Sequence, residues 1–391
     1  MGLFILRRVG VMLLTALCLT FIVFVMTNLY PNLEKLAKSE GNFRMTDIEV
    51  ATWLSNNGYR SPLDEQLLAD LKAGRITQAE ASEQVNVGFD SRIFRNYAEW
   101  LGVAPGWTGE DRDGNATGRC ILPGSDPAEA STFCGILQGY WGWSTVAKAP
   151  VTEALGTRMG NTGFLMLCVL LLMVPSALIV GVLAGMREGS GLDRSLSTFS
   201  ITTTATPEYV SGVIFIALLA SSRNGLGPLL NDWGWIEGKT LFKGTATSAM
   251  ENPNFENFFL PVLTIALYGM GYIARMTRAS MAEVMTAQYI RTARLKGVSF
   301  GNIVMKHALR NALIAPFTVI MLQFPWLLNG VVIVETLFQY KGVGWELVRA
   351  AGNNDIEMLL AISVVSVFVV LVTQLISDIG YVYLNPRISV T

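Results

Sequence analysis

The sequence predicts an all-α integral membrane protein with six transmembrane helices. Hydrophobic residues make up 51% of the chain and charged residues only 15%, which is too apolar for a soluble protein of 391 residues. Six apolar segments are each long enough to cross a bilayer, and the cations gather in alternate connections between them. The chain has one histidine and four cysteines, too few for most metal centres built from these residues or for a Ser-His or Cys-His nucleophile pair. We therefore expect no metal site and no catalytic residue.

The first span begins close to the N-terminus, where Arg7 and Arg8 precede an apolar run over residues 9–30. This run is longer than the roughly 7–15 apolar residues of a signal peptide, and no small-x-small cleavage site follows it. We expect residues 1–30 to form a cytoplasmic N-terminus and a retained first transmembrane helix.

Residues 31–160 are predicted to be an extracytoplasmic insertion. The stretch from Pro31 to Pro150 is rich in acidic residues and turn signals. Its composition favours helix from Asp64 to Ala81 and loop from Glu110 to Asn115. We expect a small helical cap on the outer side of the membrane.

Two of the four cysteines, Cys120 and Cys134, lie in this insertion, whereas Cys18 and Cys168 lie in spans. A disulfide between Cys120 and Cys134 suits an oxidising extracytoplasmic compartment. Two free thiols are the alternative.

Residues 161–391 are predicted to form a five-helix core. We expect its spans at residues 161–185, 196–220, 258–276, 313–337 and 358–384. Two arginines follow the first of these spans, six cations follow the third, and one arginine lies in the C-terminal tail. By the positive-inside rule these connections and both termini are cytoplasmic. The loop over residues 278–312 is therefore predicted to face the cytoplasm.

This loop is basic and amphipathic from Tyr289 to Asn311. Ala293, Leu295 and the straight-chain cations favour helix, and Gly297 supplies a permissive backbone at which one helix can end and another begin. We expect a short helix, a glycine turn and a second short helix.

The amino-acid sequence of this loop has a counterpart in a known protein family. It reads Tyr289-Ile290-Arg291-Thr292-Ala293-Arg294-Leu295-Lys296-Gly297, and further on His307-Ala308-Leu309-Arg310-Asn311-Ala312. This resembles the dipeptide/oligopeptide/nickel branch of the binding-protein-dependent ABC importer permeases, whose loop is similar to Y-[IV]-R-T-A-R-x-K-G and H-A-L-R-N-A. The general pattern of the family differs, because Arg291 stands where it has Glu and Arg310 where it has Pro.

Other segments resemble the same branch. They are Gly189 to Arg194, Val334-Glu335-Thr336-Leu337-Phe338 with Gly342-Val343-Gly344, and Tyr383-Leu384-Asn385-Pro386-Arg387. In the second of these, Lys341 replaces the usual Pro. The resemblance covers the first span and residues 161–388, but not the insertion.

The resemblance implies the fold of a type I ABC importer permease in a bacterial inner membrane. The implied partners are a second homologous permease, two cytoplasmic ATPase subunits, a periplasmic solute-binding protein and membrane lipid, with no nucleic acid. ATP and Mg would be bound by the ATPase subunits, and no cofactor is expected in this chain. The implied cargo is short peptides, with oligosaccharides or nickel chelates as alternatives.

The same resemblance assigns ATPase coupling to the loop. Its cations can pair with acidic groups of a partner; the alternative is that they only fix topology or bind anionic lipid headgroups. The predicted coupling residues are Tyr289, Ile290, Arg291, Thr292, Ala293, Arg294, Lys296, Gly297, His307, Arg310 and Asn311.

Three residues are candidates for the translocation path. Pro207 and Glu208 fall in the middle of an apolar segment, where a carboxylate is costly and usually faces a cavity or a partner. The alternative is a packing carboxylate that is satisfied by hydroxyls such as those of Thr202 to Thr204. Glu335 is expected to line an outer gate or, equally, to cap a helix end.

Two other classes of function are weaker. An ion-coupled secondary transporter usually has internal repeats and several intramembrane acids, and no such repeat is visible. A membrane enzyme is the weakest alternative, because no set of catalytic groups converges in the spans. ATP hydrolysis by the chain itself would need a phosphate-binding loop. Gly238-Lys239-Thr240 ends like one, but Trp233 occupies the position of its first glycine.

Overall fold

The computed structural model describes residues 2–61, 63, 65–85, 90–110, 116–121 and 126–384. Residues 111–115 of the predicted loop and residues 385–387 of the C-terminal motif lie outside the described residues. The chain divides into two compact units. We call residues 1–10, 157–348 and 368–391 the core unit, and residues 11–156 and 349–367 the insertion unit. Both are built from separate stretches of sequence.

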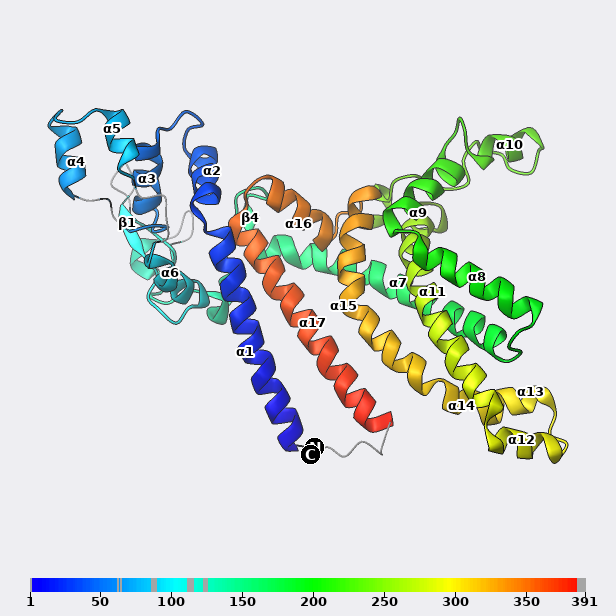
Figure 1. Cartoon of the computed structure of the whole chain (residues 1–391). Helices are drawn as coiled ribbons and strands as arrows, with labels where there is room; N and C mark the ends of the chain where they lie inside the picture. The colour runs from blue at the N-terminus through cyan, green and yellow to red at the C-terminus, as the bar shows by residue number, and fades with distance from the viewer. Residues whose placement is uncertain are drawn as a thin grey trace. The chain divides into compact units, whose positions relative to one another are not determined.

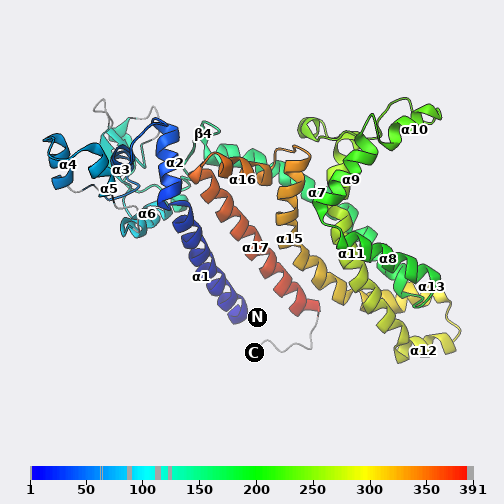
Figure 2. The same ribbon diagram turned by 45° about the horizontal axis from the view of Figure 1, so that its top comes forward.

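The core unit is helical throughout its described elements. Four helices cross its boundary with the insertion unit: α1 (Gly2–Thr27), α7 (Val151–Gly185), α16 (Val343–Gly352) and α17 (Ile356–Leu384). The others are α8 (Gly191–Ala205), α9 (Glu208–Phe215), η3 (Ile216–Ala220), α10 (Leu226–Asp232), η4 (Thr247–Met250), α11 (Phe255–Thr286), α12 (Gln288–Leu295), α13 (Phe300–Asn302), η5 (Ile303–Ala308), α14 (Leu309–Ala312) and α15 (Ile314–Leu337). α8 and α15 run beside α11 (Figures 1 and 2).

Among the described residues, four helices are long and apolar enough to cross a membrane, or up to six if each of two bent pairs counts as one span. The four lie within α1, α7, α11 and α17. The span predicted over residues 196–220 is not a straight helix: the chain bends by 102° between α8 and α9, so the pair is either one broken span or a re-entrant loop. Pro207 stands at this break, where its missing N–H and fixed φ end one helix and start the next. The second pair bends by 51° before α15.

Small residues let α7 approach α11 closely. A Cβ on Gly181 would collide with Thr277 and with the carbonyl of Ala274, and one on Gly185 would collide with the carbonyl of Arg278. The small-xxx-small pattern of these two glycines therefore serves helix contact. Leu165, Val169 and Met173 of α7 continue the same buried core.

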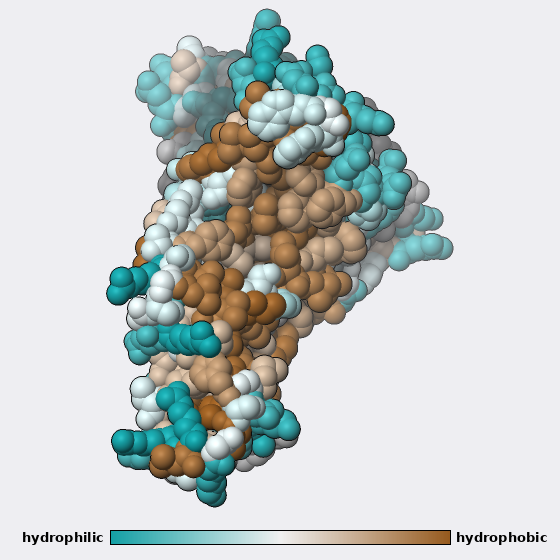
Figure 3. Space-filling model, turned by 90° about the vertical axis from the view of Figure 1, so that its right-hand side faces the viewer, coloured by the Kyte–Doolittle hydropathy of each residue, from teal (hydrophilic) through white to brown (hydrophobic). Residues whose placement is uncertain are grey.

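Hydrophobic side chains dominate the middle of the surface on the side of α8 and α10 (Figure 3). Hydrophilic side chains gather at the two ends of this surface. An apolar band between polar ends is the pattern of a surface that contacts lipid or another membrane subunit.

The insertion unit combines short helices with two small hairpins. Its helices are α2 (Tyr30–Glu40), α3 (Asp47–Asn56), α4 (Glu65–Lys72), α5 (Gln78–Glu83), α6 (Arg92–Leu101), η1 (Pro127–Glu129) and η2 (Ile136–Gln138). β1 (Thr108–Glu110) pairs antiparallel with β2 (Ala116–Gly118), and β3 (Trp143–Ser144) with β4 (Ala149–Pro150). The expected helical region is thus split into α4 and α5, with Gly74 at φ 67° between them.

An aromatic core holds these helices together. Phe24 of α1 packs against Tyr97 and Trp100 of α6, with ring centroids 5.4 and 5.5 Å apart. Leu33 and Leu54 from α2 and α3 are buried in the same cluster. This core explains how the insertion unit orders its short helices.

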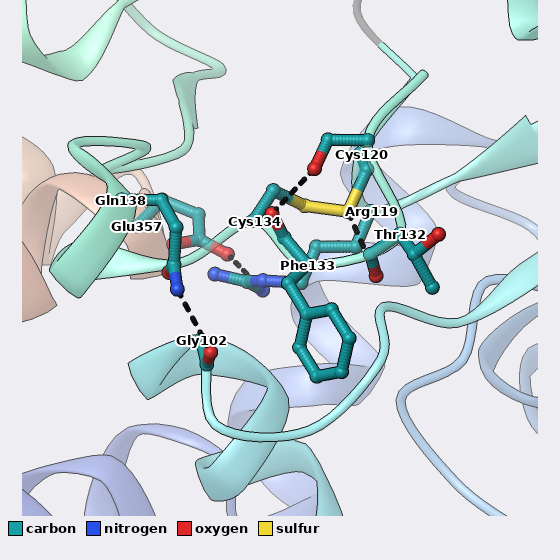
Figure 4. Close-up of a disulfide and its surroundings, with 9 residues drawn as sticks. Gly102, Arg119, Cys120, Thr132, Phe133, Cys134, Gln138 and Glu357 are labelled. Carbon is teal, nitrogen blue, oxygen red and sulfur yellow. Dashed lines mark hydrogen bonds and ion pairs between the residues drawn. A yellow bond between two sulfur atoms is a disulfide. The ribbon is translucent and has the colours of Figure 1, made fainter. Parts of the chain in front are cut away.

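The cysteines of the insertion unit are joined. Cys120 and Cys134 form a disulfide with their Cα atoms 5.5 Å apart (Figure 4). Cys18 and Cys168 are free. The bond ties the segment after β2 to the segment before η2, two stretches with little regular structure of their own.

Candidate functional site

The loop between α11 and α15 has one buried face and one exposed face. Ile290 and Ala293 of α12 are buried against a cluster that includes Met281 of α11 and Ile303 of η5. Only 8% of Ala293 is exposed, so it is not part of the surface that the loop offers to a partner. It serves the packing of the loop instead.

The exposed face of α12 is cationic with an apolar tip. Arg291, Thr292, Arg294 and Lys296 are all exposed. Leu295 between them is 84% exposed, although a leucine in a packed loop is usually buried. The sequence pattern identified the cations but not this leucine.

Gly297 ends α12 in the predicted turn. It has φ 75°, the left-handed region that a side chain disfavours. Its N–H donates to the Arg294 carbonyl over 3.0 Å, and the Val298 N–H donates to the Ala293 carbonyl over 3.2 Å. These two bonds form a Schellman motif, which satisfies carbonyls left over at the helix end. Val298 then packs on the buried cluster.

The second half of the loop is a continuous helical stretch made of α13, η5 and α14 (Figure 1). His307 and Arg310 are exposed on it. Asn311 donates to the Tyr289 hydroxyl over 2.9 Å, which joins the end of this stretch to the start of α12. The Ser280 hydroxyl donates to the Ala312 carbonyl over 2.9 Å and fixes the stretch to α11. The two predicted motif halves therefore form one compact body.

An ion pair between a half-buried arginine and a buried aspartate supports the base of α11. The Nε and Nη2 atoms of Arg278 donate to the two carboxylate oxygens of Asp193 over 2.7 and 2.8 Å. Asp193 also accepts from the Gly189 N–H and the Ser197 hydroxyl. Such two-bond contacts are strong and directional. No sequence signal pairs these two residues, beyond the fact that both belong to basic connections predicted on the same side of the membrane.

Glu335 is not exposed to a path. It is fully buried, accepts from the Thr162 hydroxyl over 2.6 Å and accepts from the Trp345 N–H over 3.0 Å. In this structure its carboxylate therefore faces a buried junction, and the helix that it caps is the next one, α16, rather than its own. Its carboxylate caps the first turn of α16 and ties it to α7.

Residues around this cap complete a polar junction between α7 and the turn before α16. Asn161 donates to the Lys341 carbonyl over 2.9 Å, and the Tyr340 hydroxyl donates to the Asn161 carbonyl over 3.0 Å. Arg158 pairs with Glu346 at 3.0 Å. Lys341 accepts this hydrogen bond through its backbone carbonyl, which every residue type has. The contact therefore does not require a Pro at this position.

Pro207 and Glu208 lie at the bend between α8 and α9. Glu208 is partly exposed in the first turn of α9, where a carboxylate is favoured by the helix dipole. A Cβ on Gly330 of α15 would lie 3.6 Å from the Glu208 carboxylate. The hydroxyls of Thr202 and Thr204 instead donate to carbonyls of their own helix. These two hydroxyls therefore make no hydrogen bond to Glu208 in this structure.

The chain matches a known protein family. Residues 177–390 match the family described as the binding-protein-dependent transport system inner membrane component. The chain is a permease of this family.

Individual relatives agree with that assignment. The permease is 33% identical to a probable peptide ABC transporter permease protein of Sinorhizobium fredii, over 65% of this chain and 77% of the relative. It is 33% identical to an oligopeptide transport system permease protein of Bacillus subtilis, over 65% and 77%. It is 32% identical to a dipeptide transport system permease protein of Haemophilus influenzae, over 65% and 78%. The family match includes the whole loop from Arg278 to Ala312 of the permease.

Proposed function

We propose that this permease, together with a second homologous permease, forms the path by which short peptides cross the inner membrane. An extracytoplasmic binding protein would deliver the peptide, and two ATPase subunits would bind ATP and Mg and drive transport. The names of the relatives carry this proposal, since they are permeases for peptides, oligopeptides and dipeptides. None of these names favours an oligosaccharide or a nickel chelate.

The loop between α11 and α15 supports the coupling role. Its inward side is held by the buried cluster, the Tyr289–Asn311 bond and the pair at the base of α11, so that it can transmit force as one body. Its outward side offers Arg291, Arg294 and Lys296 to acidic groups of an ATPase, and Leu295 to an apolar recess. Apolar anchors among charges are typical of protein interfaces.

We further propose six spans, with each bent pair crossing the membrane once and both termini in the cytoplasm. The grouping of the cations in the connections supports this orientation. The disulfide supports an extracytoplasmic position for the insertion unit. The carboxylate of Glu208, next to the bend, is the proposed contact for the peptide on its path.

The insertion unit is the proposed docking element for the binding protein. Exposed acids such as Glu83 and Glu129 can pair with a basic surface on that protein. Glu83→Lys with Glu129→Lys should raise the binding-protein concentration that gives half-maximal stimulation of ATP hydrolysis. An unchanged concentration would remove the docking role and leave the transport proposal intact.

Reconstitution of the complete transporter tests the main proposal. Peptide-loaded binding protein should stimulate ATP hydrolysis and uptake, and oligosaccharides offered in the same way should not.

Arg294→Glu should weaken retention of the ATPase subunits, and the loss should grow with salt because exposed pairs are screened. Arg223→Glu is the matched control, an exposed arginine outside the loop. Equal retention in the two variants would contradict the coupling surface, and stimulation by oligosaccharides would contradict the cargo.

A further inference from the structure

Helix α9 packs against α11 and α15 directly after the bend at Pro207 (Figure 1). Gly212 permits this contact, because a Cβ there would lie 2.5 Å from Leu337 of α15 and 3.2 Å from Thr264 of α11. Glu208 precedes Gly212 by about one helical turn and is held beside the same helices. All three helices belong to the core unit.

The carboxylate of Glu208 lies near the ring of Trp326 on α15. A Cβ on Gly330 would lie 3.6 Å from the carboxylate and 3.7 Å from the ring, so both groups surround one point that Gly330 leaves without a side chain. Glu208 is partly exposed, and within the described part of the chain its carboxylate has no hydrogen bond and no ion pair. A carboxylate in an apolar segment is costly unless it faces water, a ligand or a partner.

Trp326 is stacked on Tyr268 of α11, with ring centroids 4.4 Å apart and ring planes inclined by 14°. Both side chains are partly exposed. Neither the Trp326 N–H nor the Tyr268 hydroxyl makes a hydrogen bond to a residue that the structure describes, although these groups usually find a partner when they are buried. The pair therefore offers an accessible aromatic wall next to the carboxylate of Glu208.

The same face of α11 continues towards the loop that follows this helix. Tyr272, one turn after Tyr268, is 48% exposed, and the guanidinium carbon of Arg275 lies 5.9 Å from its ring centroid. Most of α11 within the span is otherwise buried. Tyrosine and arginine side chains on a span face a water-filled path or a protein partner rather than lipid tails. This face is therefore suited to a path for a polar ligand, with the Trp326–Tyr268 pair along it.

We propose that this place binds the amino end of the transported peptide, with the peptide ammonium on the Glu208 carboxylate and the first side chain on the Trp326–Tyr268 pair. The ammonium and the first side chain are bonded to the same Cα, so they lie close together, as the carboxylate and the ring do around Gly330. The carboxylate gains a charge-assisted hydrogen bond, and the aromatic pair buries apolar surface. The inference rests on the transport function proposed above and adds to it which end of the peptide Glu208 meets.

Photo-crosslinking in the reconstituted transporter tests the contact. With p-benzoyl-L-phenylalanine in place of Trp326, radiolabelled tri-leucine delivered by the binding protein should crosslink to the permease. The same group in place of Phe368, which is 66% exposed on α17, is the control and should not crosslink to the peptide. A crosslink to the second permease in place of the peptide, or none at this position in a transporter that takes up tri-leucine, would overturn the proposal.

Substitutions of Glu208 and Trp326 test the two halves of the site by the initial rate of tri-leucine uptake. Glu208→Gln should lower this rate roughly tenfold, because the neutral amide cannot make the charge-assisted bond, and Glu208→Asp should retain most of it. Trp326→Ala should lower the rate, and Trp326→Phe should retain most of it. Co-purification of the ATPase subunits with each variant shows that the complex has assembled.

Glu256→Gln is the matched control. Glu256 is exposed in the first turn of α11, as Glu208 is partly exposed in the first turn of α9, but it lies about 18 Å from Tyr268 along the helix. This variant should take up tri-leucine like the wild type. Wild-type rates in both Glu208→Gln and Trp326→Ala, or equal loss in the Gln and Asp variants of Glu208, would overturn this site and leave the transport proposal intact. Absence of peptide uptake by the wild type would instead contradict the transport proposal itself.

Discussion

Gly297 provides a test of how the loop between α11 and α15 keeps its shape. A Cβ at this position would meet nothing within 4 Å, so size is not what excludes a side chain. The constraint is φ 75°, which costs an L-residue about 1–2 kcal/mol. Replacing glycine with alanine offsets about 0.4–1 kcal/mol of this cost, because alanine lowers the conformational entropy of the unfolded chain. We therefore expect Gly297→Ala to destabilise the turn by about 1 kcal/mol, or roughly fivefold in its population.

The assay is ATP hydrolysis by the reconstituted transporter, with and without loaded binding protein. In Gly297→Ala and Gly297→Leu, stimulated hydrolysis and uptake should fall together by similar factors, while membrane insertion stays normal. Gly297→Asn should retain most of both, because asparagine tolerates this backbone conformation. Gly301→Ala is the matched control, since Gly301 is also exposed, has an open Cβ position and has no positive φ. Full coupling in the leucine variant, or equal loss in the asparagine and leucine variants, would refute the backbone argument.

Three further predictions concern stability. Asp193→Asn should lower the free energy of unfolding by about 1.5–3 kcal/mol, because it removes the charge that Arg278 binds. Thermal unfolding of the purified chain measures this loss. An unchanged unfolding midpoint would contradict a stabilising role for the pair. Gly342→Ala should also destabilise the chain, since the added Cβ would collide with the carboxylate that caps α16, whereas Gly352→Ala, where space is open, should not. Burial acts to raise the pKa of Asp90, but hydrogen bonds from neighbouring N–H and hydroxyl groups outweigh it and lower that pKa below 3.8. The stabilisation by Asp90 is therefore complete above its unfolded pKa and is lost as the pH falls through the folded value. The advantage of wild type over Asp90→Asn in thermal unfolding should be present at pH 7 and shrink towards pH 3, and an advantage that grows on acidification would contradict the sign.

Local features of the structure followed from the sequence where neighbouring residues determine them. The turn at Gly297 depends on one backbone angle, and the approach of α7 to α11 depends on glycines four residues apart. The apolar runs predicted most of the long helices because bilayer-length hydrophobicity needs no knowledge of the partners. In the same way, two cysteines in a single polar segment were enough to predict a bond between them.

Features that depend on distant partners did not follow from the sequence. Glu335 lies in an apolar run, and nothing in that run indicates that its carboxylate accepts a hydrogen bond from Trp345, ten residues further along the chain. The partnership of Arg278 with Asp193 links residues 85 positions apart, and no spacing rule selects it. Pro207 marked a break in its apolar segment, but the bend angle depends on how α9 packs on α11 and α15.

The insertion unit also sets an order for folding during synthesis. Its residues up to Gly156 are made early, but its buried apolar core also includes Ile356 and Leu360, which lie near the start of α17. Roughly 190 residues separate the two parts, and at about 5–20 residues per second the ribosome needs about 10–40 s to make them. Before that, Asp355 and Glu357, which bond to Ser144 and Arg119, have not been made. The residues up to Gly156 therefore cannot complete their fold. The insertion unit can complete its fold only after residues 349–367 have been made, and a product that ends before them would lack part of its apolar core.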